Sequence, residues 1–216
     1  MLNTAIDFDK VVKEYNSEGL TIVDKFLDIN TIKSIRDFSL YSGIIQEQRQ
    51  GYYAIDFNRS ELWTPELEGI VSELAEKMPS ICASFLRAWS FVYDQQCEGV
   101  SIHADPVNTN LNLWVTPDDC ISDFRRNGLI IWKSKPPKGW VYEDYNTSNE
   151  DCRNRIYEFL KNNNAEEVSI KYKFNRAIFF NSQLFHKTNG VLTRPGKANA
   201  RVNYTFLFGE DLVEKE

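Results

Sequence analysis

The 216-residue chain has only two histidines, and the first of them, His103, lies two positions before Asp105 in the segment SIHADPVN. Side chains at positions i and i+2 of an extended strand project to the same face. If this segment ends a strand, His103 and Asp105 can offer an imidazole nitrogen and a carboxylate oxygen to one metal ion. An HxD pair alone is more often an ordinary polar turn, so a metal site requires a third ligand from elsewhere in the chain.

His186 is the other histidine, and it follows the apolar segment RAIFFNSQLF. Both histidines therefore lie at predicted strand ends in the β-rich half of the chain. Two imidazoles and one carboxylate that leave three octahedral positions open form the facial triad of non-heme iron(II) oxygenases. We predict that His103, Asp105 and His186 are metal ligands, and a structural or solvent-exposed histidine is the alternative for each imidazole.

A second group of polar residues follows in the segment ARVNYTFLFG. Strand alternation places Arg201, Asn203 and Thr205 on one face and apolar side chains on the other. A polar face is unexpected in a dry core but suits the lining of a pocket, where an arginine can bind a carboxylate through two parallel hydrogen bonds. The strand NLNLWVTP has a similar pattern, with Asn110, Asn112 and Trp114 on one face, although an antiparallel strand with one wet face gives the same pattern.

Hydrophobic periodicity predicts the elements that position these residues. Helices are predicted over residues 7–15, from Asn30 or Thr31 through residue 38, and from Pro65 through residue 78, with Gly19 as a left-handed stop after the first. Strands are predicted over residues 20–26 and 51–57.

The chain becomes rich in short β-branched and aromatic segments after residue 85. Seven such segments favour a barrel or sandwich: 86–94, 99–105, 110–117, 128–132, 168–174, 176–181 and 200–209. A polar stretch at 133–164 interrupts them and contains a short helical pattern, so we interpret it as a surface loop and helix inserted between two strands.

Composition restricts the classes of partner. The net charge of −6 and the pI near 5.1 provide no basic field for a nucleic-acid backbone. No apolar stretch approaches the roughly 20 residues that span a bilayer, and the acidic beginning of the chain does not fit a signal peptide. The four cysteines have no CxxC spacing, which is typical of reduced thiols, so we expect a cytoplasmic protein.

The arrangement HAD … NLNLWVTPDD … NGLIIW … YKFNRAIFFNSQLFHKT … RVNYTFLFG resembles the 2-oxoglutarate/iron(II)-dependent dioxygenases. The similarity is greatest to the small bacterial and phage branch related to prolyl 4-hydroxylases and phytanoyl-CoA hydroxylases, and it covers roughly residues 85–209. It implies a mainly β fold with supporting helices, the double-stranded β-helix or jelly roll. Residues 1–216 would then be one oxygenase domain, in which 1–84 support a jelly-roll core at 85–209 with the insertion 133–164.

The resemblance also implies cofactors and roles for individual residues. His103, Asp105 and His186 would bind Fe(II), and 2-oxoglutarate and O₂ would be co-substrates. Arg201 would pair with the distal carboxylate of 2-oxoglutarate. It follows His186 by fifteen positions, whereas many members have this residue about ten positions on, so Arg194 is a rival. Weaker matches to co-substrate contacts are Asn112, Tyr93 and Asn203.

The implied reaction is hydroxylation of a C–H bond, coupled to decarboxylation of 2-oxoglutarate to succinate and CO₂. Trp114, Trp132 and the 133–164 insertion are candidates for the substrate side, as a lid over the iron. The substrate would be a small molecule or a peptide that the sequence does not identify, and neither nucleic acid nor a membrane is expected as a partner. Two alternatives remain: a non-catalytic jelly-roll binding module, and a cupin-type metalloenzyme that does not use 2-oxoglutarate.

Overall fold

The computed structural model describes residues 1–49, 51–58, 62–147 and 149–212, and within these ranges ten strands form two antiparallel sheets. The larger sheet has the order β1 (Leu20–Asp24), β8 (Arg176–Asn181), β5 (Thr109–Trp114), β10 (Arg201–Phe208), β4 (Phe85–Tyr93), β3 (Tyr52–Asp56), β2 (Glu47–Arg49). The smaller sheet has the order β7 (Glu167–Ile170), β6 (Gly128–Trp132), β9 (His186–Asn189).

Strand alternation explains how the larger sheet is covered on both faces. On β10, Val202, Tyr204 and Phe206 join the main hydrophobic core, which also contains Leu111 and Leu113 of β5. The opposite face of the same strands, with Arg201, Asn203 and Thr205, turns towards the smaller sheet. The predicted partition of β10 and β5 into a polar and an apolar face is therefore confirmed, and every residue of β10 is buried.

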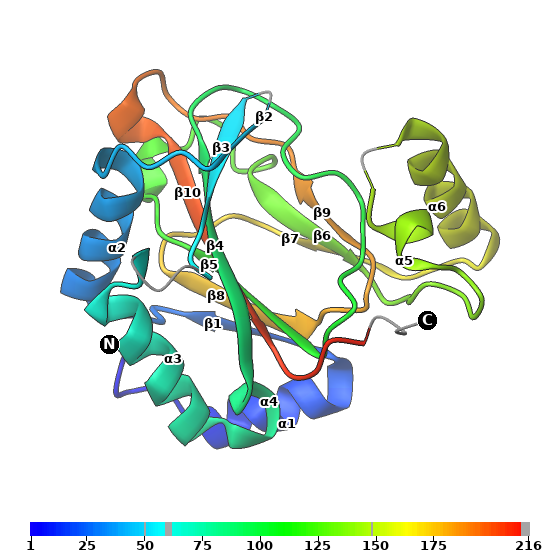
Figure 1. The fold of residues 1–216 in the computed structure, drawn as a ribbon, viewed down its shortest axis with the longest axis horizontal. Coiled ribbons are helices and arrows are strands. Elements are labelled where there is room, and N and C mark those ends of the chain that lie inside the picture. Colours follow the sequence, from blue (N-terminus) through cyan, green and yellow to red (C-terminus); the bar gives the residue numbers. More distant parts are fainter. Residues whose placement is uncertain (50, 59–61, 148, 213–216) are drawn as a thin grey trace.

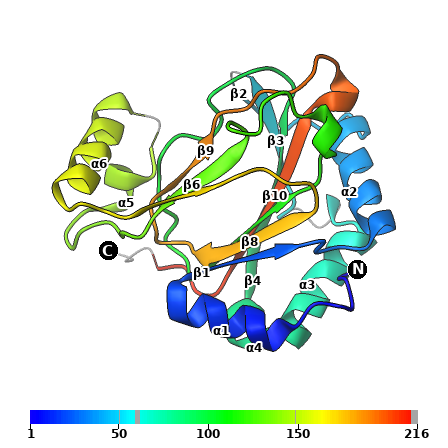
Figure 2. The same ribbon diagram turned by 180° about the vertical axis from the view of Figure 1, so that it is seen from behind.

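Four helices pack on the outer face of the larger sheet, as Figures 1 and 2 show from the two sides. They are α1 (Phe8–Glu18), α2 (Ile29–Tyr41), α3 (Pro65–Lys77) and the short α4 (Pro79–Cys82). Gly19 ends α1 in the left-handed conformation with φ 68°, as predicted. The prediction for the start of α2 is wrong, because the side chain of Asp28, and not of Asn30 or Thr31, accepts hydrogen bonds from the first turn.

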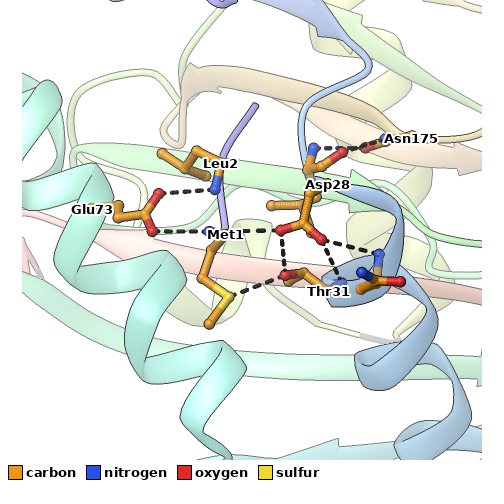
Figure 3. Close-up of polar contacts among 8 residues, drawn as sticks. Met1, Leu2, Asp28, Thr31, Glu73 and Asn175 are labelled. Carbon is orange, nitrogen blue, oxygen red and sulfur yellow. Dashed lines mark hydrogen bonds and ion pairs between the residues drawn. The ribbon is translucent and has the colours of Figure 1, made fainter. Parts of the chain in front are cut away.

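The first residues bridge α2 and α3 (Figure 3). The amino group of Met1 lies 2.9 Å from Glu73 Oε1 on α3 and 3.6 Å from Asp28 Oδ2 at the start of α2. Asp28 Oδ2 also accepts a 2.6 Å hydrogen bond from the Thr31 hydroxyl. The buried amide of Asn175 binds both the N–H and the C=O of Leu27, which joins this corner to the start of β8.

The outer face of the smaller sheet is covered by the 133–164 insertion, which forms α5 (Tyr142–Tyr145) and α6 (Glu150–Asn162). Ile156 and Leu160 of α6 pack with Ile130 and Trp132 of β6. The molecule thus consists of a helical layer, two sheets and a second, smaller helical layer. No helix in the described ranges is long and apolar enough to cross a bilayer.

The double-stranded β-helix with supporting helices is confirmed, and several local predictions need correction. Segment 99–105 is not a strand: only His103 has a β-bridge, to His186. Segment 168–174 shortens to Glu167–Ile170, because the chain leaves the sheet after Ile170. The first helix continues three residues beyond Tyr15. Four short elements, β2, α4, α5 and β9, are absent from the prediction, since three or four residues hold too little periodicity to be recognised.

Candidate metal and carboxylate site

Three side chains that the sequence singled out meet between the two sheets. His103, Asp105 and His186 each present one ligand atom, and these atoms lie within 4.8 Å of one another. His103 Nε2 lies 3.8 Å from Asp105 Oδ1, and His186 Nε2 lies 3.6 Å from Asp105 Oδ2. The backbones fix this arrangement, because His103 and His186 exchange two N–H···O=C hydrogen bonds of 3.0 and 2.8 Å.

Both imidazoles are oriented by the nitrogen that does not point into the cluster. Nδ1 of His103 lies 2.7 Å from the carbonyl of Ser101, and Nδ1 of His186 lies 2.8 Å from the carbonyl of Leu184. A carbonyl can only accept a hydrogen bond, so each Nδ1 carries a proton, and in the neutral form of either ring Nε2 is the nitrogen with the lone pair. This is the tautomer in which a histidine binds a metal through Nε2.

His186 is nearly inaccessible to solvent, at 4% exposure. Burial, together with the neighbouring His103, lowers the pKa of its imidazole to about 4. The ring is therefore neutral at physiological pH, and no proton competes with a metal for Nε2.

Asp105 is held by amide groups on both of its oxygens. Asn146 Nδ2 donates to Oδ1 at 3.1 Å, and Asn110 Nδ2 lies 3.4 Å from Oδ2. The backbone N–H of Asp105 donates to the carbonyl of Ser182 at 3.0 Å. Both the rotamer and the backbone position of this carboxylate are thus determined by its neighbours.

Arg201 is the second unusual group of the interior. Its guanidinium lies 5.3 to 5.7 Å from the ring centroids of Tyr93, Trp114 and Tyr172, and it has one long hydrogen bond of 3.4 Å to the carbonyl of Gly190. No carboxylate in the described part of the chain forms an ion pair with it, and burial lowers its pKa. A buried cation without a counter-charge is costly, which indicates a site for an anion.

Further polar atoms on the same inner face lack partners. Among the described residues, buried side-chain atoms without a hydrogen bond include Asn110 Oδ1, Asn112 Oδ1, Trp114 Nε1, Arg201 Nε and Asn203 Oδ1. These residues belong to the adjacent strands β5 and β10, where Asn112 stands opposite Thr205 and Trp114 opposite Asn203. Buried polar groups are normally satisfied, so this cluster indicates a ligand or water that binds along the face.

The group of His103, Asp105 and His186, which we call the metal cluster because it is the candidate metal site, lies at one end of this polar face. Arg201 lies at the other end. Asn110, which contacts Asp105, is four residues before Trp114, which contacts Arg201. His186 is likewise four residues before Gly190, whose carbonyl binds Arg201. Four residues of strand span about 13 Å. A five-carbon dicarboxylate is about 5 Å long, and with a metal bond at one end and a hydrogen bond at the other it reaches about 10 Å. The span of about 13 Å is measured along the backbone, and the side chains that project inward from its two ends make up the difference.

The remaining predicted residues are also located by the structure. Tyr93 stands opposite Arg201 on the neighbouring strand β4, and Asn112 donates to the Thr205 hydroxyl at 3.2 Å between the two ends. Asn203 lies on the same inner face, opposite Trp114. Arg194 is exposed in the loop before β10, so the buried position of Arg201 favours it over its rival.

The two tryptophans lie elsewhere than over the metal cluster. Trp114 is fully buried, stacks on Tyr172 with ring centroids 5.0 Å apart and contacts Arg201. Trp132 lies on the outer face of the smaller sheet, against Tyr157 of α6. Neither forms the expected lid, because alternation on β5 and β6 directs them to the arginine end and to the outside.

Sequence reasoning did not find Tyr172 and Asn146. The Tyr172 hydroxyl donates to the carbonyl of Thr116 at 2.6 Å, which fixes its ring beside Arg201. Asn146 reaches Asp105 from the insertion, 41 residues further along the chain. Neither residue is part of a recognisable motif, since each acts through a contact with a distant segment.

The donor set fits iron(II) and a dicarboxylate. Two neutral imidazoles and one carboxylate suit a divalent transition metal and leave room for further ligands. The unpaired Arg201 and the polar atoms without partners suit the far carboxylate of a chelating co-substrate.

The sequence matches no protein-family model and no curated protein. Solved structures do match. One is the non-heme α-ketoglutarate-dependent carbocyclase SnoK from nogalamycin biosynthesis, with a TM-score of 0.58 and 12% identity over 97% of this chain and 86% of that one. A Pseudomonas putida prolyl-4-hydroxylase has a TM-score of 0.56 and 10% identity over 94% of this chain and 98% of that one.

A third match is HygX from Streptomyces hygroscopicus with nickel, 2-oxoglutarate and hygromycin B bound, with a TM-score of 0.55 and 9% identity over 92% of this chain and 85% of that one. At such low identity the similarity establishes the fold. The chain therefore has the jelly-roll fold of the 2-oxoglutarate/iron(II) oxygenases.

Proposed function

We propose that this protein is an iron(II)- and 2-oxoglutarate-dependent oxygenase that hydroxylates a small molecule or a peptide and releases succinate and CO₂. The observation that carries the proposal is the pairing of two features on one inner face. A His103–Asp105–His186 cluster lies at one end, and the buried, unpaired guanidinium of Arg201 lies at the other. Either feature alone would also suit a different kind of protein, whereas together they match the two ends of one chelating dicarboxylate.

At the metal end, His103, Asp105 and His186 would hold iron(II). The bound iron, with 2-oxoglutarate and O₂, supplies the oxidant for attack on an unactivated C–H bond. The contribution of the protein is positional. The carbonyls of Ser101 and Leu184 keep both imidazoles in the metal-binding tautomer, and burial keeps His186 neutral.

At the other end, Arg201 would bind the distal carboxylate of 2-oxoglutarate. Its guanidinium is buried and has no competing carboxylate within the described ranges, so its charge is available to an entering anion. The indole N–H of Trp114 is a second buried donor beside it. Asn112 and Asn203 would contact the co-substrate between the two ends.

Tyr93 would act as a neutral wall of this pocket. Burial raises the pKa of its hydroxyl to about 12, so it does not become a competing anion next to Arg201. Its position opposite Arg201 on β4 keeps the guanidinium between aromatic rings and away from solvent. The aromatic surroundings thus favour binding of a carboxylate by an unhydrated cation.

The solved structures with the same fold indicate a broad class of substrate. They include a prolyl hydroxylase in complex with a peptide fragment and HygX with hygromycin B bound, which supports a small molecule or a peptide as substrate. We further propose that residues 1–216 act as one catalytic unit. The four cysteines are all free thiols, which supports a reducing compartment such as the cytoplasm.

The direct test is calorimetric titration of 2-oxoglutarate into the Mn(II) form, which binds co-substrate without turnover. The wild type should bind 2-oxoglutarate, and Arg201→Ala should bind it much more weakly. Arg194→Ala is the matched control and should bind as the wild type does. Metal binding without 2-oxoglutarate binding would instead favour a cupin-type metalloenzyme, and binding of neither would favour a non-catalytic module.

A further inference from the structure

In the described part of the chain, the 133–164 insertion is hydrogen-bonded to the HxD motif at the end of α5. The backbone N–H of Ala104, between the two ligands of the HxD motif, donates to the carbonyl of Tyr145 at 3.2 Å. Asn146 Nδ2 donates to the carbonyl of Ala104 at 2.9 Å and to Asp105 Oδ1 at 3.1 Å. Three hydrogen bonds therefore join the insertion to the HxD motif.

The chemistry of the partners fixes how the Asn146 amide is oriented. Both groups that it meets, a carbonyl and a carboxylate, can only accept hydrogen bonds. The NH₂ group has two hydrogens, so each acceptor receives one, while the reversed amide would place oxygen against oxygen. Asn146 thus satisfies both contacts with a single side chain, which is aimed at Asp105 and not at solvent.

The insertion that carries Asn146 is itself firmly attached. Ile156 and Leu160 of α6 pack on the outer face of the smaller sheet. Arg155 of α6 pairs with Asp144 of α5 at 2.9 Å, and its guanidinium also stacks 4.2 Å from the ring centroid of Trp140. The smaller sheet therefore supports α6, α6 holds α5, and the end of α5 presents Asn146 to the carboxylate.

We propose that Asn146 is a positioning residue for the metal centre. It would hold Oδ1 of Asp105 so that the carboxylate offers a ligand oxygen in a fixed orientation before the metal arrives. Asn110 contacts the other oxygen at a longer distance, 3.4 Å, so Asn146 is the closer of the two restraints. The inference rests on the proposed function, and it gives the insertion a second role besides covering the smaller sheet.

This role predicts a specific loss. Removal of a residue that hydrogen-bonds a metal ligand typically weakens metal binding about 10- to 100-fold. Asn146→Ala removes the donor, and Asn146→Leu removes it while keeping a side chain of similar shape. Asn149, on the same insertion, is the matched control, because its side chain caps α6 through the N–H groups of Asp151 and Cys152.

The experiment is titration of Co(II) into the metal-free full-length protein, followed by calorimetry and by the visible Co(II) spectrum. Thermal unfolding of each metal-free variant reports whether it is folded. We expect both Asn146 variants to bind Co(II) about 10- to 100-fold more weakly with a changed spectrum, while Asn149→Ala binds as the wild type does.

Unchanged Co(II) affinity in Asn146→Ala and Asn146→Leu would overturn the inference. An equal loss in Asn149→Ala would also overturn it, because folding of the insertion and not the amide of Asn146 would then be responsible. Failure of the wild type to bind Co(II) at all would be a distinct result, since it would contradict the proposed metal centre itself.

Discussion

The two ends of the inner face are built in opposite ways. At the metal end, each ligand has a hydrogen-bond partner that fixes its orientation: a carbonyl for each of His103 and His186, and two amides for Asp105. At the other end, Arg201 is surrounded by aromatic rings, and among the described residues its guanidinium has one long hydrogen bond. The side chains of the first end are therefore held in place by protein groups, whereas the charge of Arg201 at the second end is unpaired within the described residues.

On the proposed function, the difference reflects what each end would bind. A metal requires several atoms at fixed angles, so the protein restrains the ligands beforehand. A carboxylate requires a desolvated charge, so the protein keeps Arg201 unpaired at the expense of stability. The metal end should therefore lose function and gain little stability when it is altered, while the arginine end should lose function and gain stability.

The largest effect should come from removing a ligand. His186→Ala leaves two of three ligands. Loss of a group that only orients a ligand weakens metal binding by up to about 100-fold, so loss of a ligand itself should lower the Co(II) affinity further. Lys187→Ala is the control, since the adjacent side chain lies on the outer face and contacts Tyr157. Calorimetry on both variants measures the difference, and comparable Co(II) binding by His186→Ala and wild type would contradict the assignment.

Arg201→Met should affect function and stability in opposite directions. Loss of a charged hydrogen-bond partner costs about 1.5–3 kcal/mol, so the affinity for 2-oxoglutarate should fall about 10- to 100-fold. Removal of a buried, unpaired charge should raise the free energy of unfolding of the ligand-free protein by about 1 kcal/mol or more. Denaturant unfolding and calorimetry test the two parts.

A lower stability of ligand-free Arg201→Met would break the contrast between the two ends. It would mean that the three aromatic rings compensate the charge of Arg201 in the absence of an anion. The metal end supplies the comparison, because we expect no gain in stability from His186→Ala, which removes a buried side chain and leaves a cavity.

Tyr93 should make the arginine end sensitive to alkali. Burial raises the pKa of its hydroxyl from 10.0 to about 12, so above about pH 10 the unfolded chain loses this proton and the folded protein keeps it. The stability that this group contributes is complete below pH 10 and is lost as the pH rises towards 12. At about pH 11 the loss should be about 1.4 kcal/mol, and Tyr93→Phe should remove that part of the pH dependence.

Unfolding by denaturant at about pH 8 and about pH 11 measures this effect. An identical loss of stability in wild type and Tyr93→Phe would show that Tyr93 ionises normally in the folded protein.

The smallest effect is expected for Arg194→Ala. Its side chain is exposed, so the substitution should change stability by no more than about 0.5 kcal/mol and leave 2-oxoglutarate affinity unaltered. A large loss of 2-oxoglutarate affinity in Arg194→Ala would assign the carboxylate-binding role to Arg194. Arg201 would then no longer be the anion-binding group at the second end.

The sequence predicts well that His103, Asp105 and His186 meet, because few residues could form such a group. With two histidines in the chain and one of them in an HxD motif, the ligand set follows almost by counting. The polar face of β10 is also predictable, since alternation depends only on strand geometry. Both predictions use local patterns, which is why the structure retains them although residues 99–105 form a bridge and not a strand.

Contacts between distant segments could not be predicted. Asn146 meets Asp105 only because α6 packs on the smaller sheet and carries α5 with it. The position of Trp114 beside Arg201 depends on the register of β5 against β10, which aligns it with Asn203. Register and docking are set by tertiary packing, so a sequence shows which face a residue occupies but not what it meets there.

The central claim is that both ends of the inner face bind one co-substrate through one metal. The most direct test is the visible absorption spectrum under anaerobic conditions after addition of Fe(II) and 2-oxoglutarate, because chelation of the iron by the keto acid produces a charge-transfer band. The wild type should develop this band, and Asp105→Ala should not. Absence of the band in wild-type protein that is shown to contain Fe(II) would contradict the claim.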